Sequence, residues 1–152
     1  MTNLCVESAD PKLTSKGVLC LLQEPYTLEG QPKLLPKSYQ YHFGGTSPRA
    51  MIIATKEINL MKINDVSTRD MTVCLWTTGV PAFPKVLVCS VYMDKNINVL
   101  TELPKCIAYA KGNKLPVLIG ADSNTHSPLW GCDITDDSHT PREESGCCYQ
   151  LL

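Results

Sequence analysis

Several features that would restrict function are missing from this sequence of 152 residues. It has no apolar run approaching the 18 or so residues, about 27 Å of helix, that a membrane span needs. Its N-terminus lacks the basic and then apolar pattern of a secretory signal, and no lipidation motif is present. These absences predict an intracellular protein, nuclear or cytoplasmic and not secreted, with no membrane partner.

Charge is also scarce, since charged residues make up 19% of the chain and the net charge is −1. The total therefore does not indicate a strongly basic nucleic-acid-binding protein. The distribution is uneven, however, with a net charge of +4 over residues 1–121 and −5 over residues 122–152. A mildly basic body is compatible with phosphate contacts. The hydrophobic content of 43% is sufficient for the core of a single domain.

The eight cysteines include no Cys-x-x-Cys pair. Their spacings do not cluster with histidines, so no zinc site is indicated. Cys20, Cys74 and Cys89 lie inside apolar runs, where thiols behave as small hydrophobic groups. Together with the missing secretory signal, this predicts reduced thiols rather than a disulfide framework.

The most informative stretch begins with the short apolar run 117–119, which is typical of a buried strand. Gly120 and a group of small polar residues follow, among them Asp122 and Asn124. If the chain stays extended there, both side chains point to the same side. A carboxylate can orient or deprotonate a water, and a carboxamide can donate a hydrogen bond to an anionic oxygen. The alternative is that Asp122 and Asn124 simply form a turn.

Most of the remaining chain reads as strands separated by loops rich in proline and glycine. Val99, Leu103, Cys106, Ile107 and Ala110 have helical spacing, with Pro104 near the helix start and Gly112 as its C-terminal stop. Residues 1–17 show no clear periodicity, and residues 27–40 are expected to be a loop. This order predicts an α/β fold, more narrowly an α+β sandwich with mixed sheets. The expected strands cover residues 18–23, 39–43, 49–54, 58–63, 71–77, 86–93 and 117–119.

Polar side chains follow three of these apolar runs, namely Glu24, Tyr92, and Asp122 with Asn124. If the strands are neighbours, these groups converge on one edge of the fold. A carboxylate such as Glu24 suits Mg²⁺, which needs only one or two protein carboxylates and can polarise a phosphoryl oxygen. The alternatives are a surface acid for Glu24 and a half-buried strand aromatic for Tyr92.

The segment Gly-Ala-Asp-Ser-Asn-Thr-His-Ser-Pro-Leu-Trp-Gly at residues 120–131 resembles the signature of the endonuclease/exonuclease/phosphatase superfamily. More narrowly, it resembles the endonuclease domain of non-LTR retrotransposons, which is related to apurinic endonucleases. The resemblance implies a two-sheet fold and hydrolysis of DNA phosphodiester bonds with Mg²⁺ or Mn²⁺, as in a nicking endonuclease. It also implies DNA as a partner and a parent polyprotein that includes a reverse transcriptase.

The resemblance assigns roles to single residues. Glu24, in Leu-Gln-Glu-Pro-Tyr, matches the metal ligand, and Tyr92, in Ser-Val-Tyr, matches a tyrosine that contacts the scissile phosphate. Asp122 matches the aspartate that positions the attacking water, and Asn124 matches the asparagine that holds the phosphate. Weaker matches, predicted to contact substrate or to be structural, are Arg49 and Arg69 in Pro-Arg-Ala and Thr-Arg-Asp, and His126.

The resemblance covers residues 18–131 and leaves out two expected parts of the family's site. No Ser-Asp-His motif is present, and Asn3 is the only candidate for an asparagine that precedes the metal ligand. We therefore expect residues 1–152 to form a single, partial domain, truncated at both ends, with residues 132–152 as a divergent acidic tail. These missing parts leave open whether the chain is an active enzyme. The alternatives are an inactive remnant that binds nucleic acid or protein, and a small-molecule phosphatase.

Overall fold

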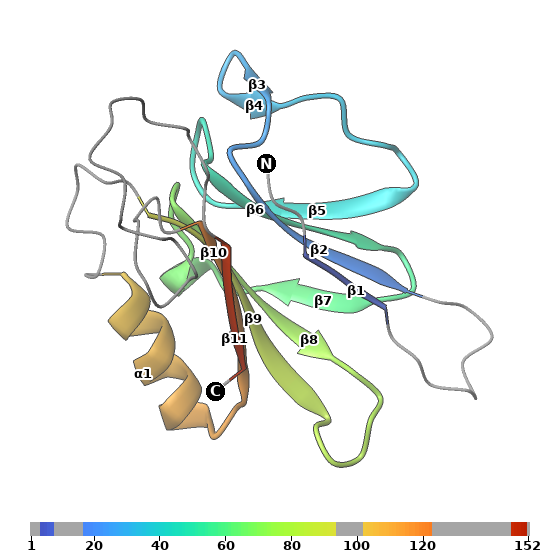
Figure 1. Ribbon diagram of the computed structural model, residues 1–152, viewed down its shortest axis with the longest axis vertical. Helices are drawn as coiled ribbons and strands as arrows, with labels where there is room; N and C mark the ends of the chain where they lie inside the picture. The colour runs from blue at the N-terminus through green and yellow to red at the C-terminus, as the bar shows by residue number, and fades with distance from the viewer. Residues whose placement is uncertain (1–3, 8–16, 94–101, 123–146, 152) are drawn as a thin grey trace, which may run out of the picture.

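The computed structural model describes residues 4–7, 17–93, 102–122 and 147–151, which form two main β-sheets, a small hairpin and one α-helix (Figure 1). In spatial order, the first sheet contains β1 (Leu4–Glu7), β2 (Val18–Gln23), β6 (Ala50–Thr55) and β5 (Tyr39–Phe43). The second contains β11 (Cys147–Leu151), β10 (Val117–Asp122), β9 (Lys85–Tyr92), β8 (Met71–Thr77) and β7 (Asn59–Lys62). The hairpin is β3 (Thr27–Leu28) and β4 (Gln31–Pro32), η1 is Asn64–Val66, and the helix is α1 (Leu103–Asn113).

The two main sheets pack against each other through alternate residues of their strands. Leu19 and Leu21 of β2 and Ile52 of β6 share one buried cluster with Cys74 of β8 and Val88 of β9. Because successive strand residues point to opposite faces, this set defines the faces that meet between the sheets. The predicted sandwich is therefore observed. Although the continuous apolar run of β2 is typical of a strand buried on both faces, β2 is fully buried on this one face only.

The helix α1 covers the other face of the second sheet. Cys106 and Ala110 of the helix share a cluster with Val73, Leu87 and Ile119 of the strands. The helix connects β9 to β10, which are parallel neighbours and therefore require a crossover connection. The described part of the chain thus has three layers, namely sheet, sheet and helix.

Both ends of α1 follow from local backbone chemistry. Pro104 lies in the first turn, as expected, where its missing N–H group costs no intrahelical hydrogen bond. Gly112 was expected to stop the helix, but the helix continues through it to Asn113. Lys114 ends the helix instead, in the left-handed conformation at φ 53°, and its N–H donates to the carbonyl groups of Ala110 and Lys111. Val99, also expected in this helix, lies outside the described residues.

Apart from the single turn η1, the elements that the sequence did not predict are short strands. These are β1, the hairpin β3–β4 inside the expected loop 27–40, and β11 inside the acidic tail. β1 is paired with β2 and β11 with β10, so their partner strands determine them more than their own pattern does. The expected strands over residues 39–43 and 71–77 have the predicted bounds, and β10 extends beyond Ile119 to Asp122. No helix in the described ranges has the length and apolar character needed to cross a membrane.

Candidate functional site

Five strand ends lie together at one end of the sandwich. β2 ends opposite the start of β6, because Gln23 pairs with Ala50, and β8 starts opposite the end of β9. β9 and β10 are parallel and end in register, with Tyr92 beside Asp122. The residues at or next to these ends, which we name the rim, are Glu24, Arg49, Asp70, Tyr92 and Asp122.

A buried polar layer directly beneath the rim connects the two sheets. The side-chain amide of Gln23 donates to the hydroxyl of Ser90 at 3.1 Å and to the carbonyl of Gly120 at 3.3 Å. The Ser90 hydroxyl in turn donates to the carbonyl of Leu22 at 3.2 Å. A side chain at Gly120 would collide with Leu21, whose Cδ1 lies 2.7 Å from an added Cβ position. The glycine thus permits the close approach that brings the end of β2 to the ends of β9 and β10.

Tyr92 and Asp122 continue this polar layer outward. Each lies two residues beyond a member of it, after Ser90 and Gly120, so each is on the same face of its strand. Asp122 is 9% exposed, and its carbonyl accepts a hydrogen bond from the N–H of Met93 at 2.9 Å. The phenol and the carboxylate are therefore placed side by side at the end of the second sheet.

Glu24 completes the rim from the first sheet. Its side chain is exposed, and its backbone has the left-handed conformation at φ 50°. Its N–H donates to the carbonyl of Arg49 at 2.8 Å, which fixes this backbone turn. A residue other than glycine in this region costs on the order of 1–3 kcal/mol and is often found at functional sites. The Glu24 carboxylate is therefore accessible to solvent at the end of β2.

The donors at this end of the sandwich can be compared with what Mg²⁺ requires. Within the described ranges, no group of three or more acidic, histidine or cysteine side chains is arranged to hold a metal ion. Mg²⁺ does not require such a group, because it keeps several waters and is held by one or two carboxylates. The exposed carboxylate of Glu24 meets that requirement.

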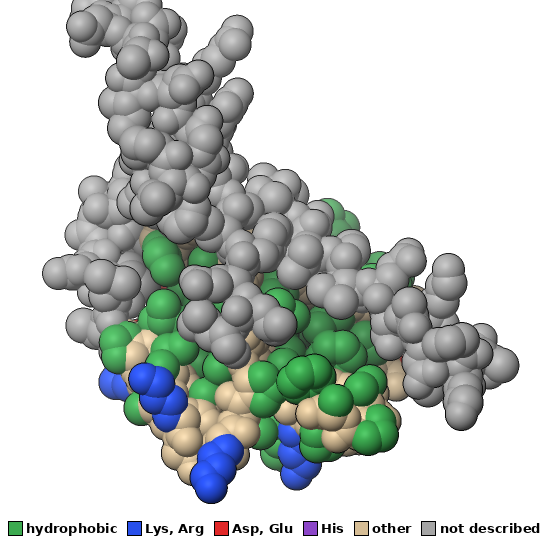
Figure 2. All heavy atoms as spheres, turned by 60° about the horizontal axis from the view of Figure 1, so that its bottom comes forward, with side chains coloured by type: hydrophobic (Ala, Val, Ile, Leu, Met, Phe, Trp, Pro, Cys, Tyr) green, Lys and Arg blue, Asp and Glu red, His purple; other side chains and the backbone are tan. Residues whose placement is uncertain are grey.

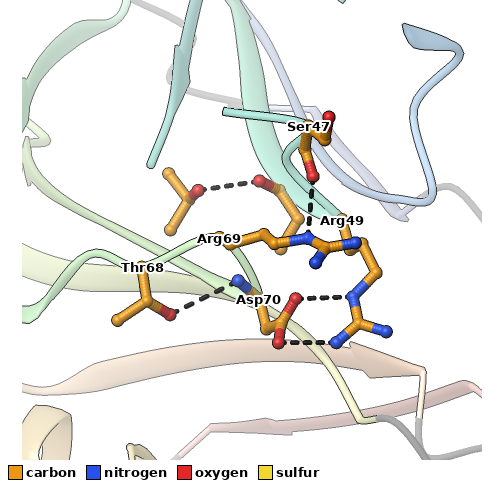
Figure 3. Close-up of polar contacts among 7 residues, drawn as sticks. Ser47, Arg49, Thr68, Arg69 and Asp70 are labelled. Carbon is orange, nitrogen blue, oxygen red and sulfur yellow. Dashed lines mark hydrogen bonds and ion pairs between the residues drawn. The ribbon is translucent and has the colours of Figure 1, made fainter. Parts of the chain in front are cut away.

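The cationic part of the rim is held by an ion pair (Figure 3). The Arg49 guanidinium donates to both carboxylate oxygens of Asp70, with Nε–Oδ1 at 2.6 Å and Nη2–Oδ2 at 2.7 Å. The same guanidinium lies over the ring of Tyr92, with its Cζ atom 4.7 Å from the ring centroid. Asp70 also binds Tyr92 through the backbone, because its carbonyl accepts from the Tyr92 N–H at 2.9 Å.

Arg69 lies beside this group on the adjoining loops. Its Nε donates to the carbonyl of Ser47 at 3.0 Å, and its own carbonyl accepts from the Arg49 N–H at 2.7 Å. The loop that contains Ser47 lies very close to Thr68, since a Cβ on Gly44 would come within 2.3 Å of the Thr68 carbonyl oxygen. Arg69 is thus positioned at the edge of the rim.

The structure brings together most of the described residues that the sequence singled out. Glu24, Arg49, Tyr92 and Asp122 all lie at the rim, and Arg69 lies next to it. Asn124 and His126 lie outside the described residues. The sequence reasoning assigned no role to three participants, although all three lie in quoted motifs; they are Gln23, Asp70 and Ser90.

The opposite end of the sandwich has a different surface. The β8–β9 loop, at the bottom of Figure 1, exposes Val80 and Phe83. Figure 2 turns this end toward the viewer and shows hydrophobic side chains with Lys and Arg side chains projecting among them. The polar groups of the candidate site are therefore gathered at one end only of the described fold.

Comparison with known proteins supports the mixed α/β fold of this chain. No protein-family model matches the chain. The solved structure of the endonuclease domain of TRAS1, a telomere-specific non-LTR retrotransposon, matches with a TM-score of 0.54 and 18% identity. The match covers 74% of this chain and 49% of that one.

A sequence relative points to the same kind of element. The chain is 25% identical over 117 residues to the putative 115 kDa protein in the type-1 retrotransposable element R1DM of Drosophila melanogaster. The match covers 76% of this chain and 11% of that protein. The two comparisons confirm the resemblance to endonuclease domains of non-LTR retrotransposons and the fold class predicted from the sequence.

Proposed function

We propose that this chain hydrolyses phosphodiester bonds of DNA in a reaction that depends on a divalent metal, as a nicking endonuclease does. The observation that carries the proposal is the placement of Glu24, Tyr92 and Asp122 at the same end of the sandwich. They come from three strands in two sheets, and the contacts of Gln23 with Ser90 and Gly120 keep those strands together. The similarity to the TRAS1 endonuclease domain supports the same activity.

Asp122, Tyr92 and Asn124 have complementary roles at the phosphate in this proposal. Asp122 orients or deprotonates the water that attacks phosphorus, and it lies beside Tyr92, whose phenol binds a phosphate oxygen. Asn124, two residues after Asp122, donates to the same phosphate. Arg69 at the edge of the rim, and His126 beyond Asn124, are proposed as weaker contacts with the DNA strand.

Glu24 is the proposed ligand for Mg²⁺ or Mn²⁺. When bound, such an ion supplies charge stabilisation at the phosphoryl group. Because the Glu24 carboxylate is exposed, it can bind the ion while waters fill the remaining coordination positions.

The proposed setting is a retrotransposon polyprotein that acts on DNA in the nucleus or cytoplasm. Both relatives belong to retrotransposons, and a reverse transcriptase is the partner that the family resemblance implies. We propose that residues 1–152 form one domain, which matches about half of the TRAS1 chain.

A second candidate is an inactive remnant that binds nucleic acid or protein without hydrolysis. The observation that favours it is that residues 1–152 contain no Ser-Asp-His motif. A phosphatase acting on small molecules is a third and weaker candidate.

Cleavage of supercoiled plasmid DNA with Mg²⁺ tests the proposal. We expect conversion to open-circular DNA, loss of the reaction on adding a chelator, and loss of at least about 100-fold in rate for Asp122→Ala. Asp65→Ala is the matched control, because Asp65 is an exposed acid in η1, outside the rim. Equal cleavage by the wild type and Asp122→Ala would reject the assignment. Binding without cleavage would favour the inactive remnant, and a preference for phosphomonoesters would favour the phosphatase.

A further inference from the structure

We propose that Arg49 is a positioning residue, which is fixed by Asp70 and holds the ring of Tyr92 at the rim. This inference rests on the proposed function, in which Tyr92 contacts the phosphate. The sequence left Arg49 open between a substrate contact and a structural residue, and the inference gives it a structural role that acts on the site. It also gives Asp70 a role that the sequence did not predict.

The ion pair with Asp70 fixes the plane of the guanidinium. Two parallel N–H···O contacts of 2.6 and 2.7 Å join the groups, and the two side chains are only 19% and 23% exposed. A two-point contact of this kind restricts both the rotation and the tilt of the guanidinium. The carboxylate also neutralises much of the charge that Arg49 would otherwise offer to a phosphate.

The fixed guanidinium then packs against Tyr92. The separation of 4.7 Å between Arg49 Cζ and the ring centroid lies within the range of about 6 Å for a cation–π contact. The carbonyl of Asp70 accepts a hydrogen bond from the N–H of Tyr92. Asp70 therefore fixes the backbone of Tyr92 and, through its carboxylate, the Arg49 guanidinium on which the Tyr92 ring packs. The N–H of Asp70 is itself bound by the Thr68 hydroxyl at 3.3 Å.

This arrangement distinguishes two roles by their kinetic signatures. A residue that acts through Tyr92 affects the rate only while Tyr92 is present, and it affects kcat more than KM. A direct phosphate contact affects binding whether or not Tyr92 is present. Arg69, whose Nε donates to the Ser47 carbonyl, provides the comparison for the second behaviour.

A double-mutant cycle on plasmid nicking tests the inference. We expect Arg49→Met and Tyr92→Leu each to lower kcat by about 10- to 100-fold, and the double variant to be no slower than Tyr92→Leu alone. Arg69→Met is expected to raise KM. In the double variant Arg69→Met/Tyr92→Leu, the losses of kcat/KM seen in the two single variants are expected to multiply. The inference would be overturned if the kcat losses of Arg49→Met and Tyr92→Leu multiplied in the double variant.

A conservative variant separates positioning from folding. Arg49→Lys keeps a cation beside Asp70 but cannot provide the flat, two-point contact. We expect it to retain the melting temperature and cooperative unfolding of the wild type and still to lose kcat as Arg49→Met does. Full activity in folded Arg49→Lys would overturn the inference, because charge alone would then be sufficient.

An NMR measurement tests the contact without using activity. We expect the Nε–H resonance of Arg49 to be shifted upfield by the Tyr92 ring, and to return downfield in Tyr92→Leu. An unshifted resonance in the wild type would overturn the inference. If the wild type does not nick DNA, the proposed function fails on that result alone, and the NMR spectra decide separately whether Arg49 holds the ring.

Discussion

The side-chain amide of Gln23 and the hydroxyl of Ser90 form a hydrogen bond of 3.1 Å between the two sheets. Both residues are buried, with exposures of 5% and 0%. Gln23 immediately precedes the candidate metal ligand Glu24, and Ser90 precedes Tyr92 by two positions. In a core that is largely apolar, a polar contact favours the one arrangement in which both partners are satisfied. The pair therefore fixes the alignment on which the candidate site depends.

Removing this contact is expected to destabilise the protein. Gln23→Met keeps a similar side-chain volume but removes the donor to Ser90 and Gly120, so the free energy of unfolding should fall by about 1–3 kcal/mol. Urea denaturation measures the change. Gln31→Met is the control, because Gln31 is exposed, and it should change stability by less than about 0.5 kcal/mol. Equal stability of the two variants would contradict the structural role of Gln23.

Two glycine substitutions are expected to act in opposite directions. A Cβ added at Gly120 would lie 2.7 Å from Leu21 Cδ1 and 3.0 Å from Leu21 Cβ. Gly120→Ala should therefore destabilise the protein by about 1–3 kcal/mol. Gly112 lies inside α1 with no atom within 4 Å of an added Cβ, so Gly112→Ala should stabilise it by about 0.5–1 kcal/mol. Thermal unfolding under identical conditions measures both, and a stabilised Gly120→Ala would refute the close contact between the sheets.

The thiol of Cys74 is expected to be unreactive in the folded protein. Burial raises its pKa from 9.0 to about 12, while Lys62 opposes the shift, so little thiolate is present near pH 8.5. Alkylation by iodoacetamide, mapped by mass spectrometry, should be slower at Cys74 than at the partly exposed Cys20. Preferential labelling of Cys74 in the native state would contradict its burial.

The same shift makes stability depend on pH in the alkaline range. The unfolded thiol ionises near pH 9 and the folded one near pH 12, so the stabilisation is complete below pH 9 and is lost as the pH rises toward 12. The contribution of this thiol is about 1.4 kcal/mol per pH unit within that window. Urea denaturation at several pH values should give a shallower decline for Cys74→Ala than for the wild type. Parallel declines would show that Cys74 does not titrate as stated.

His42 is expected to destabilise the fold in acid. Burial, and then the nearby charge of Lys62, lower its pKa below 6.5. The unfolded chain therefore binds a proton more readily than the folded one, and stability falls as the pH drops below about 6.5. His42→Gln should reduce this dependence between pH 7.5 and pH 5, measured by urea denaturation. An unchanged dependence would assign the acid sensitivity to other groups.

The local pattern of residues was sufficient to predict most of the strands. Alternation or a continuous apolar run depends only on residues close in the chain, and the strands over residues 39–43 and 71–77 were predicted with their observed bounds. Short strands such as β1 and β11 were not predicted, because pairing with a longer neighbour determines them. The helix end at Lys114 was missed because Gly112 has the composition of a stop signal but not its backbone conformation.

Glu24, Tyr92 and Asp122 were found as candidates from the sequence alone, because each follows an apolar run and lies in a motif that resembles a known family. Their meeting at one rim was decided by tertiary structure, since the pairing of sheets brings together residues that are distant in the chain. The same applies to Arg49 and Asp70, which are 21 residues apart and form an ion pair only because β6 and β8 start at the same end of the sandwich. Sequence patterns report which face a residue occupies, whereas only packing determines which faces meet.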